Sequence, residues 1–476
     1  MVEGWLAKCE ALTLTRLGAE SLGPYAARPA LGGGFPRAEA RPGFTGLMCF
    51  VLLFTGVFGA LIAVIVAAFY GQGAGAWAIG FLYVGYDVGL QVALLVSAWL
   101  AVMRPATNPA SDVSPSLAVL VPCRNEALVL PACVAALQPQ LEPGDRLLVV
   151  DDGSIDGSAV WCHAHGVEVL AKPNSGKSDS LNQALGLVDQ EVVVTIDADT
   201  VIKPGSLAAI RVAFRDPRLV AAGGLLEVVT RPALLGRWLG WHQRAEYLRS
   251  FLWRSAWEKW GTLLLISGAF AAYRRTALVS VGGLATRSHA EDYEITHRLH
   301  RASLDGGHDW RLGMIPGAQA VTDAPATIRL FLAQRTRWFS GFISVHLAYR
   351  DLVGARRAKA LGLIMLPIKT CDLLLPIYGL FAIAVLIAFY AFGFNIPSVI
   401  IWVLFAKLAF DLAAAVVAVY LMRRWAGWDA SAGPRLASIL AATACEPFAY
   451  QMLRQLAALL GWISFLRRRT NWTPQR

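Results

Sequence analysis

Residues Val192–Asp199 read VVVTIDAD, an apolar and β-branched run that ends in two carboxylates. A related segment, RLLVVDDGS, lies earlier in the chain at Arg146–Ser154. Two further short apolar runs have the same form, LAVLVP at Leu117–Pro122 and VEVL at Val167–Leu170. Short apolar runs bounded by polar residues are typical of strands buried on both faces of a parallel sheet. The polar residues cluster at the carboxyl ends of these predicted strands, where open α/β sheets bind their ligands.

Segments with helical patterning separate the predicted strands. They lie near residues 127–141, 157–165, 177–188 and 205–214. Strands that alternate regularly with helices indicate an α/β domain with a parallel sheet. The middle of the chain is therefore predicted to be a water-soluble α/β domain.

The rest of the chain is much more apolar than a soluble protein. Of its 476 residues, 56% are hydrophobic and 16% are charged, whereas soluble globular domains carry about 25% charged residues. Long apolar runs occupy residues 46–70, 77–103, 374–394, 397–422 and 436–466. A transmembrane helix needs roughly 20 such residues. We therefore predict five spans; a re-entrant or interfacial segment is the alternative for the last, and buried core helices are the alternative for the others.

A few charged residues interrupt these apolar runs. Charged side chains inside a membrane are costly where they face lipid, so they face a water-filled path or pair with one another. Both interpretations stay open for this set, which comprises Asp87, Lys407, Asp411, Glu446 and Arg454.

Basic residues near the predicted spans indicate the orientation of the chain. Arg37 and Arg41 precede the first span and Arg104 follows the second, while the loop 71–76 between them has no basic residue. Because basic loops stay on the cytoplasmic side, residues 1–45 and the region from about 104 to 360 are predicted to be cytoplasmic. Five spans would place the basic tail 467–476 outside, in conflict with the same rule.

Composition also argues against several classes of protein. The seven cysteines form no Cys-x-x-Cys pair and no short-spaced cluster with histidine, so neither a disulfide framework nor a zinc site is predicted. The net charge of +10 fits basic flanks beside an anionic lipid surface. No nucleic-acid-binding motif is present, and nucleic acid is not predicted as a partner.

Two pairs of carboxylates follow the predicted strands. Asp197 and Asp199 are two residues apart, and side chains at that spacing in an extended chain point the same way. They are candidates for a hard divalent cation, which takes few protein carboxylates and completes its shell with water and phosphate oxygens. Asp151 and Asp152 form the other pair, for which an ordinary turn is the alternative.

A lysine lies between the two carboxylate pairs, in the segment KPNSGK at Lys172–Lys177. A basic residue in a glycine-containing loop at the start of a helix suits a diphosphate. The segment is not a Walker loop because Ala171 stands where the first glycine would be, so ATP hydrolysis is disfavoured. Lys177 is the candidate diphosphate ligand.

Two motifs follow later in the chain. Glu291 and Asp292 precede a helical stretch, where a carboxylate is commonly only a helix cap. Gln334, Arg337 and Trp338 share one face of a predicted helix because they are three and four residues apart. An amphipathic helix on a membrane surface is the alternative for the second motif.

Taken together, these motifs resemble those of the membrane-integral glycosyltransferases of family 2, which make cellulose, chitin, hyaluronan and poly-N-acetylglucosamine. The resemblance covers residues 115–345. It is carried by Asp151-Asp152-Gly153, Asp197-Ala198-Asp199, Glu291-Asp292 and Gln334-x-x-Arg337-Trp338, with support from Asn125-Glu126, Asn174-x-Gly176-Lys177, Glu246-Tyr247 and Ser267-Gly268-Ala269. Two positions depart from the family pattern: Ala290 replaces a threonine, and Ser178-Asp179-Ser180-Leu181 replaces a run of small residues.

The resemblance implies a GT-A type α/β domain, with a mixed and mostly parallel sheet, inserted between transmembrane helices. It implies inverting transfer from a UDP-sugar, with Mg²⁺ or Mn²⁺ as the cofactor. Asp292, beside Glu291, would be the general base, and Asp197 and Asp199 would hold the metal. The nucleotide-sugar would be bound by Glu126, Asp151, Asp152, Lys177 and Asp197, and the acceptor and donor site would include Gln334, Arg337 and Trp338.

This family organisation divides the chain into six parts. They are a cytoplasmic extension (1–45), two transmembrane helices (46–103), the cytoplasmic GT-A domain (104–345), interfacial helices (346–373), about three transmembrane or re-entrant helices (374–466) and a basic tail (467–476). The resemblance places the protein in a bacterial inner membrane. Its expected partners are a UDP-sugar, a growing polysaccharide, the lipid bilayer and an accessory or regulatory subunit.

The activity expected from the resemblance is processive synthesis of a β-linked polysaccharide from UDP-N-acetylglucosamine or UDP-glucose, with export through the protein's own helices. A non-processive enzyme that adds one sugar to a lipid is the first alternative, because such enzymes share these motifs. A transporter or inactive scaffold is the alternative from another class, and the presence of every expected carboxylate argues against it.

Overall fold

The computed structural model describes residues 74–103, 114–230, 234–286, 288–393, 398–427 and 436–467. The predicted extension 1–45, the first predicted span at 46–70 and most of the basic tail lie outside these described residues. The chain forms two compact units. We call the unit whose described residues include 114–229 and 264–286 the sheet unit, and the unit whose described residues include 74–103, 234–263 and 324–393 the helical unit.

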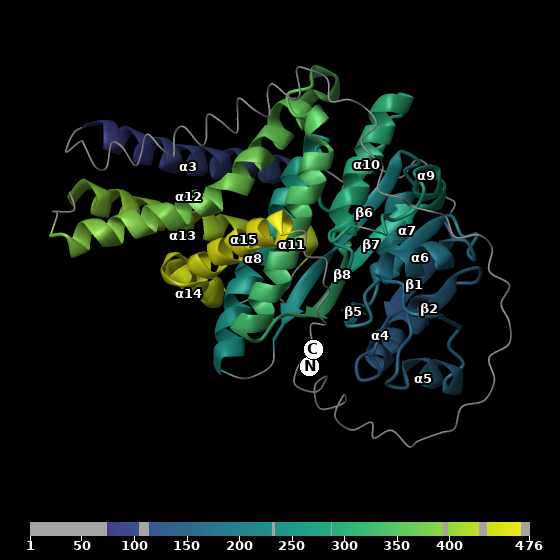
Figure 1. Cartoon of the computed structure of the whole chain (residues 1–476). Helices are drawn as coiled ribbons and strands as arrows, with labels where there is room; N and C mark the ends of the chain where they lie inside the picture. Colours follow the sequence, from purple (N-terminus) through teal and green to yellow (C-terminus); the bar gives the residue numbers. More distant parts are fainter. Residues whose placement is uncertain are drawn as a thin grey trace. The chain divides into compact units, whose positions relative to one another are not determined.

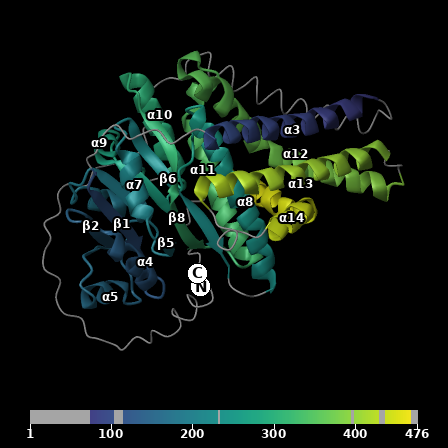
Figure 2. The ribbon, with the colours of Figure 1, turned by 180° about the vertical axis from the view of Figure 1, so that it is seen from behind.

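The sheet unit is built on one eight-stranded sheet with the order β3-β2-β1-β4-β7-β6-β8-β5. Parallel pairing joins β1 to β2 and β4, β2 to β3, and β6 to β8, while β7 is antiparallel to β4 and β6, and β5 to β8. Its strands lie side by side in both views (Figures 1 and 2). Their bounds are β1 Leu117–Cys123, β2 Arg146–Asp151, β3 Val169–Ala171, β4 Val192–Ile196, β5 Thr200–Ile202, β6 Leu219–Val229, β7 Phe270–Arg274 and β8 Arg311–Asp323.

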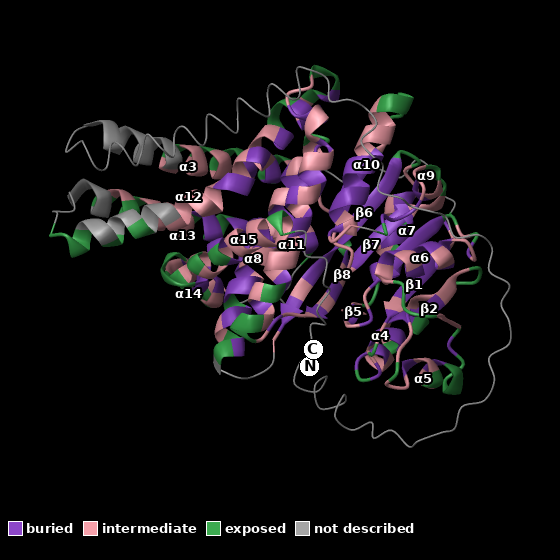
Figure 3. Cartoon of the chain, in the orientation of Figure 1, coloured by how far each residue is buried: buried purple, intermediate pink, exposed green. Residues whose placement is uncertain are grey.

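The first half of this unit confirms the α/β prediction. Strands β1 to β4 fall within or next to the four predicted runs, and helices occupy the predicted segments between them. These helices are α4 Leu130–Leu137, α5 Ser158–Ala164, α6 Lys177–Leu185 and α7 Ser206–Phe214. Strands β1 and β4 are almost wholly buried, as Figure 3 shows for β1, because helices cover a parallel sheet on both faces.

Strands β5 to β8 were not predicted from the sequence. Strand β6 contains Gly223 and Gly224, and β8 contains Pro316 and Gly317, all residues that indicate turns in a single sequence. Gly224 is explained by packing, since a Cβ atom there would overlap the ring of Phe270 on β7. The same unit also contains α9 Arg275–Ser280 and α10 Glu291–Gly306.

The helical unit contains α3 Ala74–Val102, α8 Leu234–Lys259, α11 Ile328–Ala348, α12 Leu366–Ala391, α13 Ser398–Ala426, α14 Leu436–Cys445 and α15 Tyr450–Leu466. Among the described residues, three segments are long and apolar enough to cross a membrane: Val84–Val102, Leu361–Leu380 and Trp402–Ala426. Two match predicted spans closely. The third begins at Leu361, within the segment predicted to be interfacial, because a π-helical turn at Leu361–Met365 leads directly into α12.

The last predicted span, residues 436–466, is divided in the structure. Helices α14 and α15 are separated by a 3₁₀ turn at Glu446–Phe448. Proline in a helix interior removes a backbone hydrogen bond and clashes with the preceding turn, so Pro447 accounts for the interruption. The segment therefore consists of two short helices rather than one long helix.

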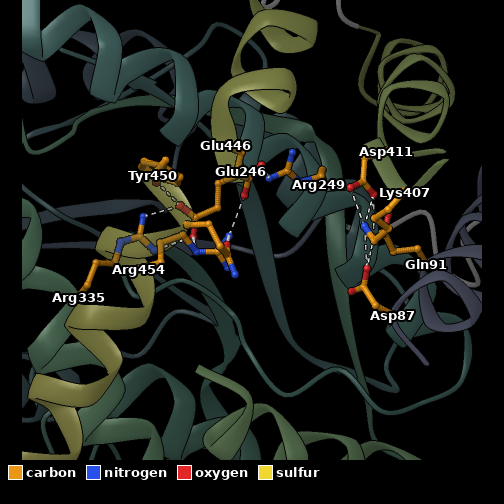
Figure 4. Close-up of polar contacts among 11 residues, drawn as sticks. Asp87, Gln91, Glu246, Arg249, Arg335, Lys407, Asp411, Glu446, Tyr450 and Arg454 are labelled. Atoms are coloured by element: carbon orange, nitrogen blue, oxygen red, sulfur yellow. Dashed lines mark hydrogen bonds and ion pairs between the residues drawn. The ribbon is translucent and has the colours of Figure 1, made fainter. Parts of the chain in front are cut away.

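Most of the charged residues in the apolar runs pair with one another. Between α3 and α13, the Lys407 ammonium lies 2.9 Å from Asp87 and 2.5 Å from Asp411. Gln91 donates a hydrogen bond to Asp87 at 2.9 Å and to Asp411 at 3.3 Å. Figure 4 shows Asp87, Gln91, Lys407 and Asp411 together at the right of the view. Of the two interpretations left open by the sequence, pairing between helices is the one that the structure shows for these residues.

Candidate active site

Two loops at the carboxyl edge of the sheet are held together by Asp152. Its carboxylate accepts hydrogen bonds from Lys172 at 2.6 Å and from the backbone amides of Ser175 and Gly176, each at 2.8 Å. Burial of the carboxylate would raise its pKa, but the lysine and the two amides outweigh burial, and the pKa of Asp152 is lowered. Asp152 is therefore ionised near neutral pH and fixes the loop that leads to Lys177.

Asp151 and Gly153 shape the turn after β2. The Asp151 carboxylate accepts hydrogen bonds from the hydroxyl and the backbone amide of Ser154, the latter at 3.2 Å. Gly153 has a φ of 78°, and a Cβ atom there would lie 3.0 Å from the backbone nitrogen of Asn174. The two aspartates therefore have different structural roles. Asp151 closes its own turn, whereas Asp152 holds the neighbouring loop.

Lys177 brings together residues from three parts of the sheet unit. Its ammonium lies 2.5 Å from a carboxylate oxygen of Asp197, 3.7 Å from Glu291, and 3.4 Å from the carbonyl oxygen of Gly268. Burial would lower the pKa of Lys177, but the carboxylates outweigh it and raise that pKa. The lysine thus remains a cation between the end of β4 and the start of α10.

Asp292 lies in the same cluster, at the N-terminal end of α10. One of its carboxylate oxygens accepts a hydrogen bond from the amide of Gly268 at 3.0 Å, and the other from the amide of Tyr293 at 2.8 Å. Burial and the charge of Glu291 raise the pKa of Asp292 to about 6, although the Gly268 amide and Lys177 act in the opposite direction. Asp292 thus titrates close to neutral pH, as a general base should.

Asp197 and Asp199 lie in a turn rather than along a strand. Strand β4 ends at Ile196, and the amide of Thr200 donates a hydrogen bond to the Asp197 carbonyl at 2.9 Å, which closes the turn before β5. Asp199 is half-buried, with the hydroxyls of Thr200 and Thr322 at 3.4 and 3.5 Å from its carboxylate. The sequence-based assumption that both residues lie in an extended segment, and so point the same way, was therefore wrong.

The oxygen donors of this turn suit a hard divalent cation. Asp197 already accepts a charge-assisted contact from a cation, Lys177. Among the described residues there is no group of three or more histidine, cysteine or acidic side chains able to enclose a metal. The two aspartates would therefore leave coordination positions for water and phosphate oxygens, the arrangement that Mg²⁺ favours.

Glu126 lies in the loop between β1 and α4. Its backbone amide donates a hydrogen bond to Ser158 at 3.1 Å, and its neighbour Asn125 has a φ of 56°. The Asn125 side chain accepts a hydrogen bond from the Ile155 amide at 2.9 Å. These contacts tie the loop after β1 to the loop after β2 and fix the position of Glu126 at the carboxyl edge of the sheet.

The three residues predicted for the acceptor and donor site lie on α11, in the helical unit. Gln334 is 8% exposed, and Arg337 and Trp338 are half-buried. Sequence reasoning missed Arg335, which lies between them and forms a bidentate ion pair with Glu246 at 2.9 and 3.0 Å. No pattern in the motif distinguishes Arg335 from Arg337, because the partner of Arg335 is 89 residues away in the sequence.

Part of the chain is similar to known glycosyltransferases. Residues 118–282 match the family described as glycosyl transferase family 2. The chain is 30% identical over 285 residues to an N-acetylglucosaminyltransferase from Rhizobium leguminosarum bv. viciae, covering 54% of this chain and 64% of the relative. It is 27% identical over 258 residues to a poly-beta-1,6-N-acetyl-D-glucosamine synthase from Staphylococcus epidermidis, covering 52% of this chain and 60% of the relative. The chain therefore contains a glycosyl transferase family 2 domain and spans less than two thirds of the length of these relatives.

A similar solved structure is the mannosyltransferase PcManGT from Pyrobaculum calidifontis. The TM-score is 0.46 and the identity is 20%, with 87% of this chain and 99% of that chain covered. The mixed sheet and the family 2 domain together make the sheet unit a GT-A-like glycosyltransferase fold.

The buried contact between Lys172 and Asp152 should contribute strongly to stability. Their side chains are only 6% and 7% exposed, and removing one partner of a buried pair costs about 3–5 kcal/mol. We expect Lys172→Met to lower the thermal unfolding temperature of the detergent-purified protein at pH 7. Because the pKa of Asp152 is lowered in the folded state, the loss should shrink as the pH falls and Asp152 becomes protonated.

Lys203→Met is the matched control for this prediction. Lys203 pairs with Glu227 at 3.0 Å in the same unit, but the two side chains are 28% and 21% exposed. More exposed pairs contribute about 0–1 kcal/mol, so this variant should unfold close to the wild type. Equal changes in unfolding temperature for the two variants would show that the Lys172–Asp152 contact stabilises the protein no more than the more exposed pair does.

Proposed function

We propose that this protein is an inverting, processive glycosyltransferase that extends a β-linked polysaccharide from a UDP-sugar. The observation that carries the proposal is the cluster of Lys177, Asp197, Glu291 and Asp292, where a half-buried cation lies among three carboxylates and the pKa of Asp292 is about 6. The names of the relatives favour UDP-N-acetylglucosamine over UDP-glucose as the donor.

In this proposal the donor is held by the loops at the carboxyl edge of the sheet. Glu126, Asp151 and Asp152 belong to the nucleotide side of the site, and Lys177 carries the positive charge that a diphosphate requires. Asp197 and Asp199 would hold Mg²⁺ or Mn²⁺, which would stabilise the negative charge of the leaving UDP.

Asp292 is the proposed base for a single displacement. Its carboxylate takes the proton of the acceptor hydroxyl while that oxygen forms a bond to the anomeric carbon, and the bond from that carbon to UDP breaks. The Gly268 and Tyr293 amides fix the orientation of the carboxylate. Glu291 supports the reaction by raising the pKa of Asp292 toward neutrality.

The membrane part of the proposal rests on the helical unit. Gln334, Arg337 and Trp338 are assigned to the acceptor and donor, and the apolar helices to export of the growing chain through the bacterial inner membrane. The distribution of basic residues supports a cytoplasmic catalytic domain. An accessory subunit remains part of the prediction, and transfer of one sugar to a lipid is the second candidate function because lipid-directed enzymes share the same motifs.

Product size separates these candidates. Purified protein would be incubated with each labelled UDP-sugar, with and without Mg²⁺ or Mn²⁺, and the products sized by gel filtration. Polymer formed from one donor in the presence of metal supports the proposal, whereas one sugar per lipid supports the alternative. Absence of any metal-dependent UDP release would contradict both.

The pKa of Asp292 predicts the pH dependence of the reaction. The base must be deprotonated, so turnover should be constant above about pH 7 and fall as the pH drops through about 6. Asp292→Asn should lower turnover by about 10²–10⁴-fold, remove this inflection and leave donor affinity nearly unchanged. The measurement is the initial rate of UDP release; a variant that loses donor affinity but keeps turnover would make Asp292 a binding residue.

The metal assignment predicts a distinct effect at Asp199. Asp199→Asn replaces a charged oxygen ligand by a neutral one, so the Mn²⁺ concentration needed for half-maximal turnover should rise by about tenfold or more. Titration of Mn²⁺ at saturating UDP-sugar measures this change. An unchanged metal requirement would remove Asp199 from the cation site.

Processivity depends on Trp338 in this proposal. An aromatic ring offers a flat face on which a sugar stacks, and Leu keeps apolar burial without that face. Trp338→Leu should therefore yield little polymer while slow, metal-dependent UDP release continues. Polymer of normal length from this variant would show that Trp338 acts only as an apolar anchor.

A further inference from the structure

A half-buried ionic network joins three helices of the helical unit (Figure 4). Glu246 on α8 accepts hydrogen bonds from both terminal guanidinium nitrogens of Arg335 on α11. It also accepts a hydrogen bond from the Tyr450 hydroxyl at 2.5 Å. Arg454 on α15 lies 3.9 Å from the same carboxylate and 3.0 Å from Glu446. Arg249 on α8 completes the network through Glu446 at 2.6 Å.

Glu246 is charged at every physiological pH. Burial would raise its pKa, but Arg335, Arg454 and Tyr450 outweigh burial and lower the pKa to about 2. The side chains of Glu246 and Arg335 are 17% and 13% exposed. A planar guanidinium with two parallel hydrogen bonds to a carboxylate is fixed in orientation as well as in position.

The fixed guanidinium group of Arg335 contacts two aromatic rings on α11. Its guanidinium carbon lies 4.5 Å from the centre of the Trp338 ring and 5.2 Å from that of Phe331. Phe331 is fully buried against Leu239 and Tyr450. Glu246 therefore fixes the guanidinium group of Arg335, and this group makes a cation–π contact with the Trp338 ring.

Gln334, the residue before Arg335, has a buried side-chain oxygen that lacks a hydrogen-bond donor among the described residues. Its side chain is 8% exposed, and within the described part of the chain its Oε1 atom has no hydrogen-bond partner. A buried carbonyl oxygen without a donor is costly. A hydroxyl group of a bound sugar is a donor of the required chemistry.

We propose that Glu246 is a positioning residue for the acceptor sugar and acts through Arg335. The bidentate pair sets the rotation of α11, so that the Trp338 ring and the Gln334 carbonyl oxygen present a stacking face and a hydrogen-bond acceptor to one sugar. This inference rests on the proposed glycosyl transfer. It predicts that loss of the Glu246 charge uncouples donor cleavage from sugar transfer.

Glu246→Gln tests the inference because it keeps the shape of the side chain and removes its charge. Labelled polymer and released UDP are measured together at saturating UDP-N-acetylglucosamine and Mn²⁺. Since a displacement of about 1 Å costs roughly 10²-fold in rate, polymer formation should fall by about 10- to 100-fold. Metal-dependent hydrolysis of the donor by water and the KM for the donor should stay near wild type. The ratio of UDP released to sugar transferred should therefore rise.

Arg249→Gln is the matched control. It removes an ion pair of the same network that includes neither α11 nor Glu246, and Glu446 keeps Arg454 at 3.0 Å. Within the described residues, Arg249 forms no hydrogen bond with Glu246 and acts on it only as one of several charges that lower its pKa. The ratio of UDP released to sugar transferred should remain that of the wild type. A ratio changed as much as in Glu246→Gln would show that the network acts only on general stability and would overturn the proposal.

Arg335→Lys provides a second test that does not depend on how well Glu246→Gln folds. Lysine keeps the positive charge but loses the bidentate geometry and the planar face over Trp338. The same rise in the ratio is expected, and a wild-type ratio in this variant would overturn the inference. If the wild type itself releases no UDP with metal, the proposed glycosyl transfer fails instead, so the two failures are distinguishable.

Discussion

The candidate active site depends on one electrostatic constraint: the half-buried carboxylates of Asp197, Glu291 and Asp292 lie close together and need a cation. Lys177 supplies it from the first residue of α6, with contacts to Asp197 and Glu291. The conformation of the loop before α6, and hence the placement of Lys177, is fixed by Asp152 through its contacts with Lys172, Ser175 and Gly176. The strand ends, the loop and the start of α10 are therefore parts of one charge arrangement.

The helical unit solves a similar problem with different residues. There the arginines outnumber the carboxylates near Glu246. The three arginines, Arg249, Arg335 and Arg454, share the two carboxylates of Glu246 and Glu446. Close packing accompanies the charges, because a Cβ atom at Gly461 on α15 would lie 2.8 Å from the Cβ atom of Phe339 on α11. Polar contacts and small residues together fix the neighbouring helices, as expected where apolar burial alone gives little specificity.

The sequence allowed the parallel half of the sheet to be predicted, because β1 to β4 are apolar runs that end in polar residues. It did not allow β6 and β8 to be predicted, since their glycines and Pro316 serve tertiary packing and irregular pairing. The candidate site residues were predicted from residue type, spacing and the family resemblance, and the structure brings Lys177, Asp197, Glu291 and Asp292 together. The direction of Asp199, the partner of Arg335 and the break at Pro447 depend on contacts between distant segments, which periodicity does not encode.

The pairing of Asp87 with Lys407 has a consequence for the synthesis of the chain. The two residues are 320 positions apart, and ribosomes add about 5–20 residues per second. The α3 helix therefore enters the bilayer tens of seconds before its cation exists. During that interval the Asp87 carboxylate has no cationic partner, and its cost, at most about 2.5–3.5 kcal/mol for a carboxylate at the centre of a span, must be offset by the apolar segment Val84–Val102. Pairing with Lys407 removes this cost once α13 has been made.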